Sequence, residues 1–428
     1  SQSVSSRSRE TARRRLGIAA LSGPAADHES VTGDRYKEAM LAATPITPHG
    51  AHRAPRRPAG AAARLARAGA ALVGTALVRT ALVGTALVGT ALAGATPAGA
   101  AERGVSAPVP AAAPAAAPVV VAHRGASGYL PEHTLVAKAY AYAAGADYLE
   151  QDVVLTKDDV PVVMHDLTLE GVTDVETVYP ERRRPDGRWY VIDFTYAELQ
   201  RLAVHERVDP RTGQPTWTAR FHERGLPLRI HALADELALV RGLNAATGRE
   251  VGVYTEVKSP AWHRAQGKDA SAVVLRTLAE FGYRTRADRA YVQCFDFDEL
   301  KRMRTELKSD LKLVQLIGDN SWAESGTDYD RLRTPAGLRE IARYADGIGP
   351  WIPQIVTWPA GGGAPVFSTL AGDARAAGLV VHPYTFRIDQ LPPNAPDAAA
   401  LHRALFETAR VDGVFTDFPD RTLRWLGR

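Results

Sequence analysis

Short apolar runs alternate with longer amphipathic stretches from residue 119 to the C-terminus. The first run, Val119–Ala122, is too short for a helix and rich in β-branched residues, which predicts a buried strand. A helical stretch follows from Pro131 to Gly145, with proline near its first turn and glycine at its end. The next apolar run, Asp147–Leu155, predicts a second strand. Strand, helix and strand make a βαβ unit, so these two strands should be parallel.

The alternation of strands and helices continues along the rest of the chain. Six further strands are expected at Val251–Lys258, Ala290–Phe295, Leu311–Ile317, Asp346–Gly349, Leu379–Tyr384 and Asp412–Asp417. Helices are expected between them, among others at Gly267–Phe281, Asp296–Leu307 and Pro335–Tyr344. Eight strands with intervening helices predict an α/β fold, a TIM (β/α)8 barrel. A short apolar run, Val162–Met164, is then an excursion beyond the second strand.

A long stretch interrupts this rhythm after the second strand region, from about residue 166 to residue 228. It is far too long for an ordinary connection. Long insertions on the C-terminal face of a barrel usually shape the pocket, and we expect this one to do so. The insertion carries the aromatic residues Trp189, Tyr190, Trp217 and Phe221. The alternative is that they form a small core of the insertion itself, which is expected for most of them.

The first 118 residues differ in composition from the rest of the chain. Residues 1–39 are polar and basic without an apolar period, which predicts disorder, and Met40 could be the true start. An arginine-rich segment, an apolar repeat up to Ala95 and the small-residue triplet Ala98–Ala100 then follow. Together they indicate a cleaved secretory signal peptide and a secreted or periplasmic protein. The alternative is a retained membrane anchor, but Arg79 leaves the apolar run short of the ~20 residues that a span requires.

The expected organisation is a disordered extension plus signal peptide over residues 1–100, an Ala/Pro-rich linker over 101–118, and the barrel over 119–428. Residues 1–100 carry 13 Lys/Arg and 5 Asp/Glu, and the whole chain carries +4, so the remainder carries −4. The barrel therefore lacks the basic surface of a nucleic-acid-binding protein. The single cysteine, Cys294, excludes an intrachain disulfide and is expected to be a buried, inert thiol.

Two carboxylates interrupt the second predicted strand. Glu150 and Asp152 are two positions apart, so their side chains share one face of the strand. Adjacent carboxylates repel each other unless a cation or a proton lies between them. A solvated strand face is the alternative, but it fits poorly beside the apolar Leu149 and Val153. Hard oxygen donors favour calcium or magnesium over zinc.

Further polar residues fall at the ends of predicted strands, where barrel enzymes collect their catalytic groups. They are His123, Arg124, His165, Glu256, Lys258, Gln293, Gln315 and Asp417. A lone histidine at a strand end is more often structural than catalytic. Two histidines, three carboxylates, an arginine and a lysine at one rim are hard to explain structurally.

Three motifs carry a family resemblance: HRGASGYLPEHT from His123, YLEQDVVLTKDDVPVVMHD from Tyr148, and TEVK from Thr255. Together they resemble the glycerophosphodiester phosphodiesterases, nearest to the periplasmic bacterial type, and the resemblance runs from Val119 to the C-terminus. It implies a TIM barrel with a divalent cation at its mouth, which hydrolyses deacylated phospholipids to glycerol 3-phosphate and an alcohol. It assigns acid–base catalysis to His123 and His165; we expect His123 to be the base and His165 the acid.

The remaining site residues have roles that suit this reaction. A cation on Glu150, Asp152 and Glu256 would lower the barrier by stabilising charge on the phosphate oxygens; calcium is expected, with magnesium as the alternative. The phosphate is expected to be bound by Arg124, Lys258 and Gln293. The attacking oxygen could belong to water or to the neighbouring glycerol hydroxyl, which would form a cyclic phosphate.

Small glycerophosphodiesters are therefore the expected partners, with no nucleic acid and no stable membrane anchor. One alternative is a related barrel phosphodiesterase that acts on larger lipids or on teichoic acid. Another is a surface-binding protein that kept the barrel but lost turnover.

Overall fold

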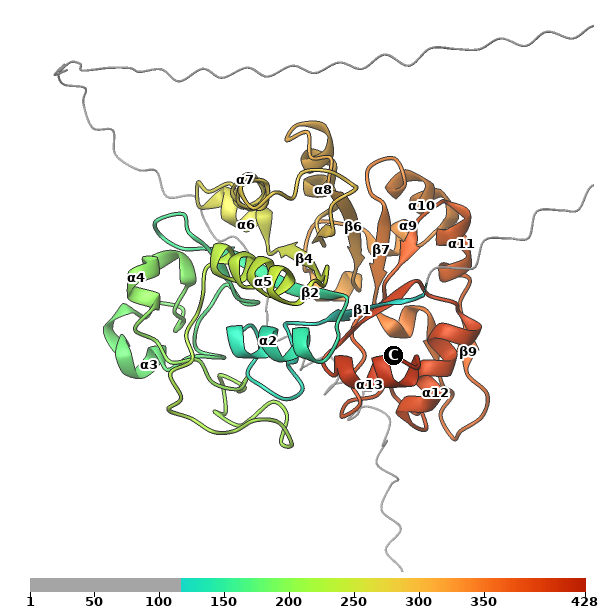
Figure 1. Cartoon of the computed structure of the whole chain (residues 1–428), viewed down its shortest axis with the longest axis horizontal. Coiled ribbons are helices and arrows are strands. Elements are labelled where there is room, and N and C mark those ends of the chain that lie inside the picture. The colour runs from blue at the N-terminus through green and yellow to red at the C-terminus, as the bar shows by residue number, and fades with distance from the viewer. Residues whose placement is uncertain (1–116) are drawn as a thin grey trace, which may run out of the picture. The chain divides into compact units, whose positions relative to one another are not determined.

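The strands form a parallel barrel in the order β10-β7-β6-β5-β4-β2-β1-β11 (Figure 1). The strands are β1 (Val119–Ala122), β2 (Tyr148–Leu155), β4 (Gly252–Val257), β5 (Ala290–Cys294), β6 (Lys312–Ile317), β7 (Gly347–Pro350), β10 (Val380–Val381) and β11 (Gly413–Thr416). This computed structural model describes residues 117–428. Backbone hydrogen bonds from Asp412 to Val381 and from Phe415 to Pro383, both 3.0 Å long, close the ring. The predicted TIM barrel is confirmed.

The expected features of residues 1–116, namely the extension, the signal peptide and most of the linker, lie outside the described residues. Within residues 117–428, no helix combines the length and the apolar character needed to cross a membrane.

Helices surround the strands in Figure 1. They are α2 (Leu135–Ala143), α5 (Leu233–Thr247), α6 (Pro260–Ala265), α7 (Ala270–Glu280), α8 (Phe297–Thr305), α9 (Tyr329–Leu332), α10 (Pro335–Ile341), α11 (Leu370–Ala376), α12 (Ala398–His402) and α13 (Pro419–Trp425). The prediction that the first helix starts at Pro131 is wrong. Thr134 caps α2 instead, because its side-chain oxygen accepts a hydrogen bond from the Ala137 backbone N–H. Residues 131–133 therefore belong to the loop after β1.

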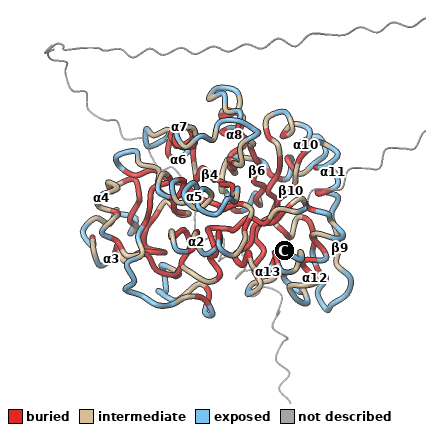
Figure 2. Tube along the Cα trace, viewed as in Figure 1, coloured by how far each residue is buried: buried red, intermediate tan, exposed pale blue. Residues whose placement is uncertain are grey.

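Side chains that alternate along the strands build two separate cores. One core lies between the strands and the helices and includes Leu149, Val153 and Cys294, the predicted buried thiol. The other fills the barrel interior, where Tyr254 stacks on Tyr291 at 4.6 Å between ring centroids. Figure 2 shows the strands buried at the centre, with exposed segments around them.

The insertion starts after β3 (Pro161–Val163), which pairs antiparallel with β2 and confirms the predicted excursion. It contains the short helices α3 (Val175–Val178) and α4 (Tyr196–Leu199) and has its own buried cluster, which includes Trp189. Tyr190 and Trp217 are not in this cluster: Tyr190 stacks on Trp262 of α6, and Trp217 packs against the guanidinium of Arg220, which also belongs to the insertion. A small hairpin of β8 (Val356–Thr357) and β9 (Val366–Phe367) follows β7.

Candidate active site

A pocket opens at the C-terminal end of the barrel, where the polar strand ends meet. It holds about 650 Å³ of open space, within the range of ~300–1,000 Å³ that is usual for small-molecule sites. All the residues that the sequence assigned to catalysis, phosphate binding or metal binding line it: His123, Arg124, Glu150, Asp152, His165, Glu256, Lys258 and Gln293. The sequence therefore selected residues that the fold brings together, although their individual roles stay predictions.

Strand register explains why the carboxylates converge. Asp152 of β2 pairs with Glu256 of β4, and Glu256 pairs with Gln293 of β5. Residues in register on parallel strands share one face of the sheet, so these three side chains form a row across the barrel wall. Glu150 lies on the same face two positions before Asp152, as the sequence predicted.

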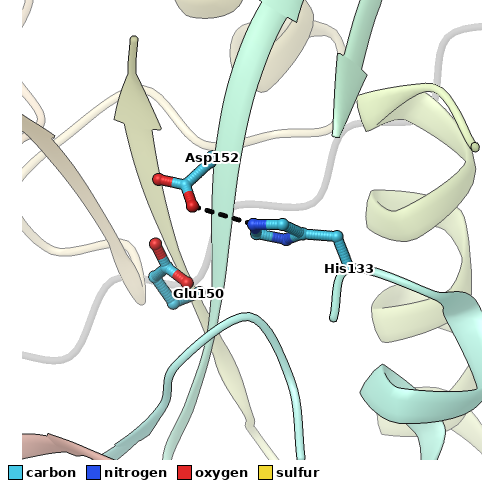
Figure 3. A group of neighbouring side chains, drawn as sticks. All are labelled: His133, Glu150 and Asp152. Atoms are coloured by element: carbon cyan, nitrogen blue, oxygen red, sulfur yellow. Dashed lines mark hydrogen bonds and ion pairs between the residues drawn. The ribbon is translucent and has the colours of Figure 1, made fainter. Parts of the chain in front are cut away.

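Three side chains form a compact group that could hold a metal ion: His133, Glu150 and Asp152 (Figure 3). Their ligand atoms all lie within 4.8 Å of one another. His133 Nε2 lies 2.8 Å from Asp152 Oδ2. The other oxygen of Asp152 is buried and has no hydrogen-bond partner among residues 117–428. A buried carboxylate oxygen without a donor fits a divalent cation, which would satisfy it directly.

The electrostatics of the carboxylates also fit a cation. Burial, together with the neighbouring Asp152 carboxylate, raises the pKa of both Glu150 and Glu256 well above the usual value. Although burial opposes it, Lys258 and nearby histidines hold the pKa of Asp152 well below the usual value. A divalent ion between these crowded carboxylates would relieve the repulsion that raises the pKa of Glu150 and Glu256.

His133 is a group near the pocket that the sequence interpretation missed. It was assigned to the helix, whereas the structure places it in the loop after β1 with a φ of 58°. The same loop turns at Arg124, which also has a positive φ of 56°, and the Arg124 backbone N–H donates to Glu150 Oε2 at 2.6 Å. The signal that could have revealed the loop was Thr134, a strong helix-capping residue directly after His133.

His123 is held by a carboxylate. Its Nδ1 lies 2.7 Å from Asp417 Oδ1, and the Asp417 side chain is almost fully buried. Burial lowers the pKa of His123 to about 4, although Asp417 acts in the opposite direction. The ring is therefore neutral at neutral pH, and Nδ1 donates its proton to Asp417, which leaves the lone pair on Nε2.

His165 has a matching arrangement. Its Nδ1 lies 2.5 Å from Asp166 Oδ1. Burial and the nearby charges of Arg124 and Lys258 lower the pKa of His165 to about 3 in the ligand-free pocket. Both predicted catalytic histidines thus have a carboxylate at Nδ1, and no carboxylate of the described part of the chain pairs with Nε2 of either ring.

Fixed positive charge lies next to the carboxylates. Arg124 Nη1 bonds both oxygens of Glu132 at 3.0 Å, while its buried Nε lies 3.4 Å from Asp152 Oδ2 in an ion pair. Lys258 Nζ lies 2.7 Å from Glu256 Oε1 and 3.8 Å from Glu324. Acidic neighbours raise the pKa of both cations although burial opposes this, so both stay charged.

The other wall of the pocket was not foreseen. It consists of Phe295, Leu316, Trp322, Glu324, Tyr384, Thr385, Arg387 and Phe415. Gln315, which was expected at the rim, does not line the pocket, because its amide donates to the backbone oxygens of Phe295 and Leu316. The expectation that the insertion shapes the pocket is also wrong, since no residue between 166 and 228 lines it.

Comparison with known proteins agrees with this geometry. Residues 123–421 match the model of the glycerophosphoryl diester phosphodiesterase family. A glycerophosphodiester phosphodiesterase of Haemophilus influenzae is 41% identical over 332 residues, which cover 72% of this chain and 89% of that protein. One of Treponema pallidum is 38% identical over 334 residues, which cover 72% of this chain and 92% of that protein.

A solved structure shares the fold. A Silicibacter pomeroyi protein, whose crystal structure carries the name glycerophosphoryl diester phosphodiesterase, superposes with a TM-score of 0.54 at 27% identity. The match covers 73% of this chain and 94% of that one. Fold, pocket and sequence similarity thus agree: the chain belongs to the glycerophosphoryl diester phosphodiesterase family and is an enzyme of that class.

Proposed function

We propose that the chain is a metal-dependent hydrolase that cleaves small glycerophosphodiesters into glycerol 3-phosphate and an alcohol by histidine acid–base catalysis. One observation carries the proposal: two histidines, each bonded to a carboxylate, line the same pocket as a carboxylate cluster, an arginine and a lysine. A phosphodiester is anionic and resists nucleophiles. Its hydrolysis therefore needs positive charge, a proton acceptor and a proton donor in one place.

Buried polar atoms in the pocket support the assignment of the phosphate-binding residues. Within residues 117–428, Arg124 Nε is a buried donor that makes an ion pair of 3.4 Å with Asp152 Oδ2 but no hydrogen bond, and it can donate to a phosphate oxygen. Gln293 Oε1 is a buried acceptor without a partner, and it can accept from a substrate hydroxyl. Lys258 adds a charged ammonium group beside the carboxylates.

Glu150, Asp152 and Glu256 would hold the divalent cation, with His133 at hydrogen-bond distance from Asp152. When bound there, the cation supplies positive charge to the phosphate oxygens. Calcium is the proposed ion and magnesium the alternative, because calcium tolerates irregular coordination by protein oxygens and substrate hydroxyls.

The histidines move the protons. His123 accepts the proton of the attacking hydroxyl at Nε2, and the resulting imidazolium is stabilised by Asp417. His165, protonated at Nε2 when the anionic substrate is bound, donates this proton to the alkoxide that leaves as its P–O bond breaks. The bound phosphodiester brings a negative charge into the pocket and so opposes the lowered pKa of His165.

The attacking hydroxyl belongs to water or to the glycerol carbon next to the ester, and in the second route water opens the cyclic phosphate. A substrate with hydrogen in place of that glycerol hydroxyl separates the two routes. Full turnover of this analogue supports attack by water. Loss of turnover, together with a cyclic phosphate detected by phosphorus NMR on the normal substrate, supports the glycerol route.

The decisive experiment measures glycerol 3-phosphate released from glycerophosphocholine, glycerophosphoethanolamine and glycerophosphoglycerol after chelation and after addition of each metal. We expect no turnover in chelator, full recovery with calcium, and partial recovery with magnesium. A bound ion should also raise the melting temperature by mass action. Full activity in excess chelator would contradict the metal dependence. Preferential hydrolysis of sphingomyelin or of a glycerol-phosphate polymer would contradict the substrate class.

A further inference from the structure

The insertion does not line the pocket, yet it carries two buried arginines that contact the carboxylates of the site. Arg207 and Arg220 have side chains that are 5% and 2% exposed. Both residues lie in the segment between 166 and 228 that interrupts the barrel. Each guanidinium bonds the carboxylate that in turn bonds a histidine of the pocket.

Arg220 contacts the carboxylate beside His123. Its Nη2 donates to Asp417 Oδ2 at 2.7 Å, while Asp417 Oδ1 lies 2.7 Å from His123 Nδ1. The same guanidinium forms a two-point ion pair with Asp389 at 2.8 and 3.1 Å. It also packs over Trp217 at 3.9 Å from the ring centroid. Arg220 is thus fixed on several sides. Together with Arg387, whose Nε donates to the same oxygen at 2.7 Å, it fixes the Asp417 oxygen that the histidine does not use.

Arg207 repeats the arrangement at His165. Its Nη1 donates to Asp166 Oδ2 at 2.6 Å, while Asp166 Oδ1 bonds His165 Nδ1. Its Nη2 and Nε bond the two oxygens of Glu132 at 2.6 and 3.0 Å. Glu132 also binds the guanidinium of Arg124. Arg207 therefore connects the carboxylate at one histidine to the carboxylate at the phosphate-binding arginine.

We propose that Arg207 and Arg220 are positioning residues, through which the insertion sets the orientation of both histidines. A carboxylate bonded only to an imidazole can rotate about its own axis and carry the ring with it. An arginine bonded to the second oxygen blocks this rotation, because its planar fork fixes the direction of the hydrogen bonds. The inference rests on the acid–base roles of His123 and His165 under the proposed function.

The competing explanation is that these arginines only fasten the insertion to the barrel. In that case, removing either arginine would lower kcat by the same factor whether or not the histidine that it serves is present. A positioning role instead makes the loss depend on the histidine that each arginine serves. A double-mutant cycle separates the two explanations, because coupling appears only between residues that act through each other.

The first experiment therefore compares Arg220→Gln in the wild-type and His123→Ala backgrounds. We expect Arg220→Gln to lower kcat by about 10-fold in the wild type, at the lower end of the usual effect of removing an orienting partner, because Arg387 still bonds Asp417 Oδ2. In the His123→Ala background it should cause no further loss. Arg220→Lys keeps the positive charge between Asp417 and Asp389 but lacks the planar guanidinium. We therefore expect an intermediate loss of kcat in the wild type and no further loss in the His123→Ala background. The Lys variant provides the measurement if the Gln variant fails to fold.

The second experiment uses leaving groups to tell the arginines apart. p-Nitrophenolate needs no proton from an acid, so the kcat defect of Arg207→Lys should be large with a choline leaving group and small with p-nitrophenolate. Because Arg207 also supports Arg124 through Glu132, its variants should raise KM as well. The kcat defect of Arg220→Lys should be the same with both leaving groups.

Arg184→Gln is the matched control, because Arg184 lies in the same insertion and forms a two-point ion pair with Asp193, away from both histidines. It should keep wild-type kcat. Equal losses from Arg220→Gln with and without His123, or losses no larger than in the control, would overturn the positioning role. If His123→Ala itself kept wild-type turnover, the acid–base mechanism would fail instead.

Discussion

At the scale of single residues, the two histidines are equivalent in their contacts but not in their surroundings. Each has a carboxylate at Nδ1. Burial is the main cause that lowers the pKa of both rings. The nearby charges of Arg124 and Lys258 lower the pKa of His165 further, and those of Arg124 and Arg387 lower that of His123. The geometry alone therefore does not say which ring is the base, and chemistry has to distinguish them.

We expect His123→Ala and His165→Ala each to lower kcat by about 10²- to 10⁴-fold, because each removes a proton-transfer group. A p-nitrophenolate leaving group should partly restore His165→Ala, since it leaves without a proton. Steady-state kinetics with both leaving groups measure this, and circular dichroism checks that the fold is intact. Restoration of His123→Ala instead would exchange the two roles, and unchanged kcat in either variant would make that histidine structural.

The metal ligands raise a second question at this scale. The sequence assigned Glu256 to the cation, whereas the compact group in the structure contains His133 with Glu150 and Asp152. Glu256 lies in register with Asp152, but its Oε1 is paired with Lys258. Both can take part if Glu256 binds the ion directly and His133 orients Asp152 through its 2.8 Å contact.

Under this arrangement, Glu256→Gln should weaken metal affinity because it removes a charged ligand. His133→Ala should weaken metal affinity by about 10- to 100-fold because it removes the residue that orients Asp152. Calorimetric titration of metal-free protein with calcium measures both. Glu170→Gln is the control, because its carboxylate pairs with Arg188 of the insertion and should leave calcium affinity unchanged. Wild-type affinity of Glu256→Gln would remove Glu256 from the ligand set.

At the scale of elements, strand periodicity predicted for some strands, but not for all, which side chains point into the barrel. Glu150 and Asp152 are charged residues in an apolar strand, so their shared face was evident from the sequence. β6 is buried on both faces, so its apolar residues do not reveal which face points inward. Gln315 lies on the outer face with Leu313 and Ile317, which only the barrel geometry decides.

The seam of the barrel between β10 and β11 contains a titratable residue with a simple environment. His382 follows β10, is buried, and lies 3.1 Å from the Tyr254 hydroxyl. Burial lowers its pKa from 6.5 to about 4. In the folded state the ring therefore stays neutral between pH 6.5 and 4, whereas in the unfolded state it binds a proton. The stability that the neutral ring contributes is present above pH 6.5 and is lost as the pH falls towards 4.

We expect this one group to reduce the free energy of unfolding by about 2 kcal/mol between pH 7.5 and pH 5. His382→Gln removes the titrating ring, and the glutamine amide can still bond Tyr254. Between pH 7.5 and pH 5 this variant should therefore lose about 2 kcal/mol less free energy of unfolding than the wild type. Urea unfolding at the two pH values measures the difference. His222→Gln, at an exposed histidine, should keep the wild-type dependence. An unchanged dependence in His382→Gln would contradict the assignment.

At the scale of the whole molecule, we propose that the chain is exported and cleaved after Ala100. The proposal rests on the basic segment, the apolar repeat and the small-residue triplet that precede residue 101. The expected mature protein begins at Ala101, and N-terminal sequencing of secreted material measures this. Replacement of Ala98 and Ala100 by larger residues should prevent cleavage, while the same change at Ala111 and Ala113 should not. Mature protein that retains the ALVGT repeat would contradict the proposal.

The sequence alone determined the barrel, the βαβ order and the eight residues assigned to catalysis, phosphate binding and metal binding that line the pocket. These depend on local periodicity and on the rule that parallel strands place their C-terminal ends at one rim. It also placed the carboxylates of β2 on one face, because two positions along a strand always share a side.

Only the tertiary structure decided which groups support the histidines and the metal ligands. Asp417 is 294 residues from His123, and Arg207 is 41 residues from Asp166 along the chain. Such contacts leave no period in the sequence, since loops and insertions follow their own local hydrogen bonds until the barrel brings them together. For the same reason only the fold showed that His133 contacts Asp152, although the Thr134 cap that places His133 in the loop is a local feature of the sequence.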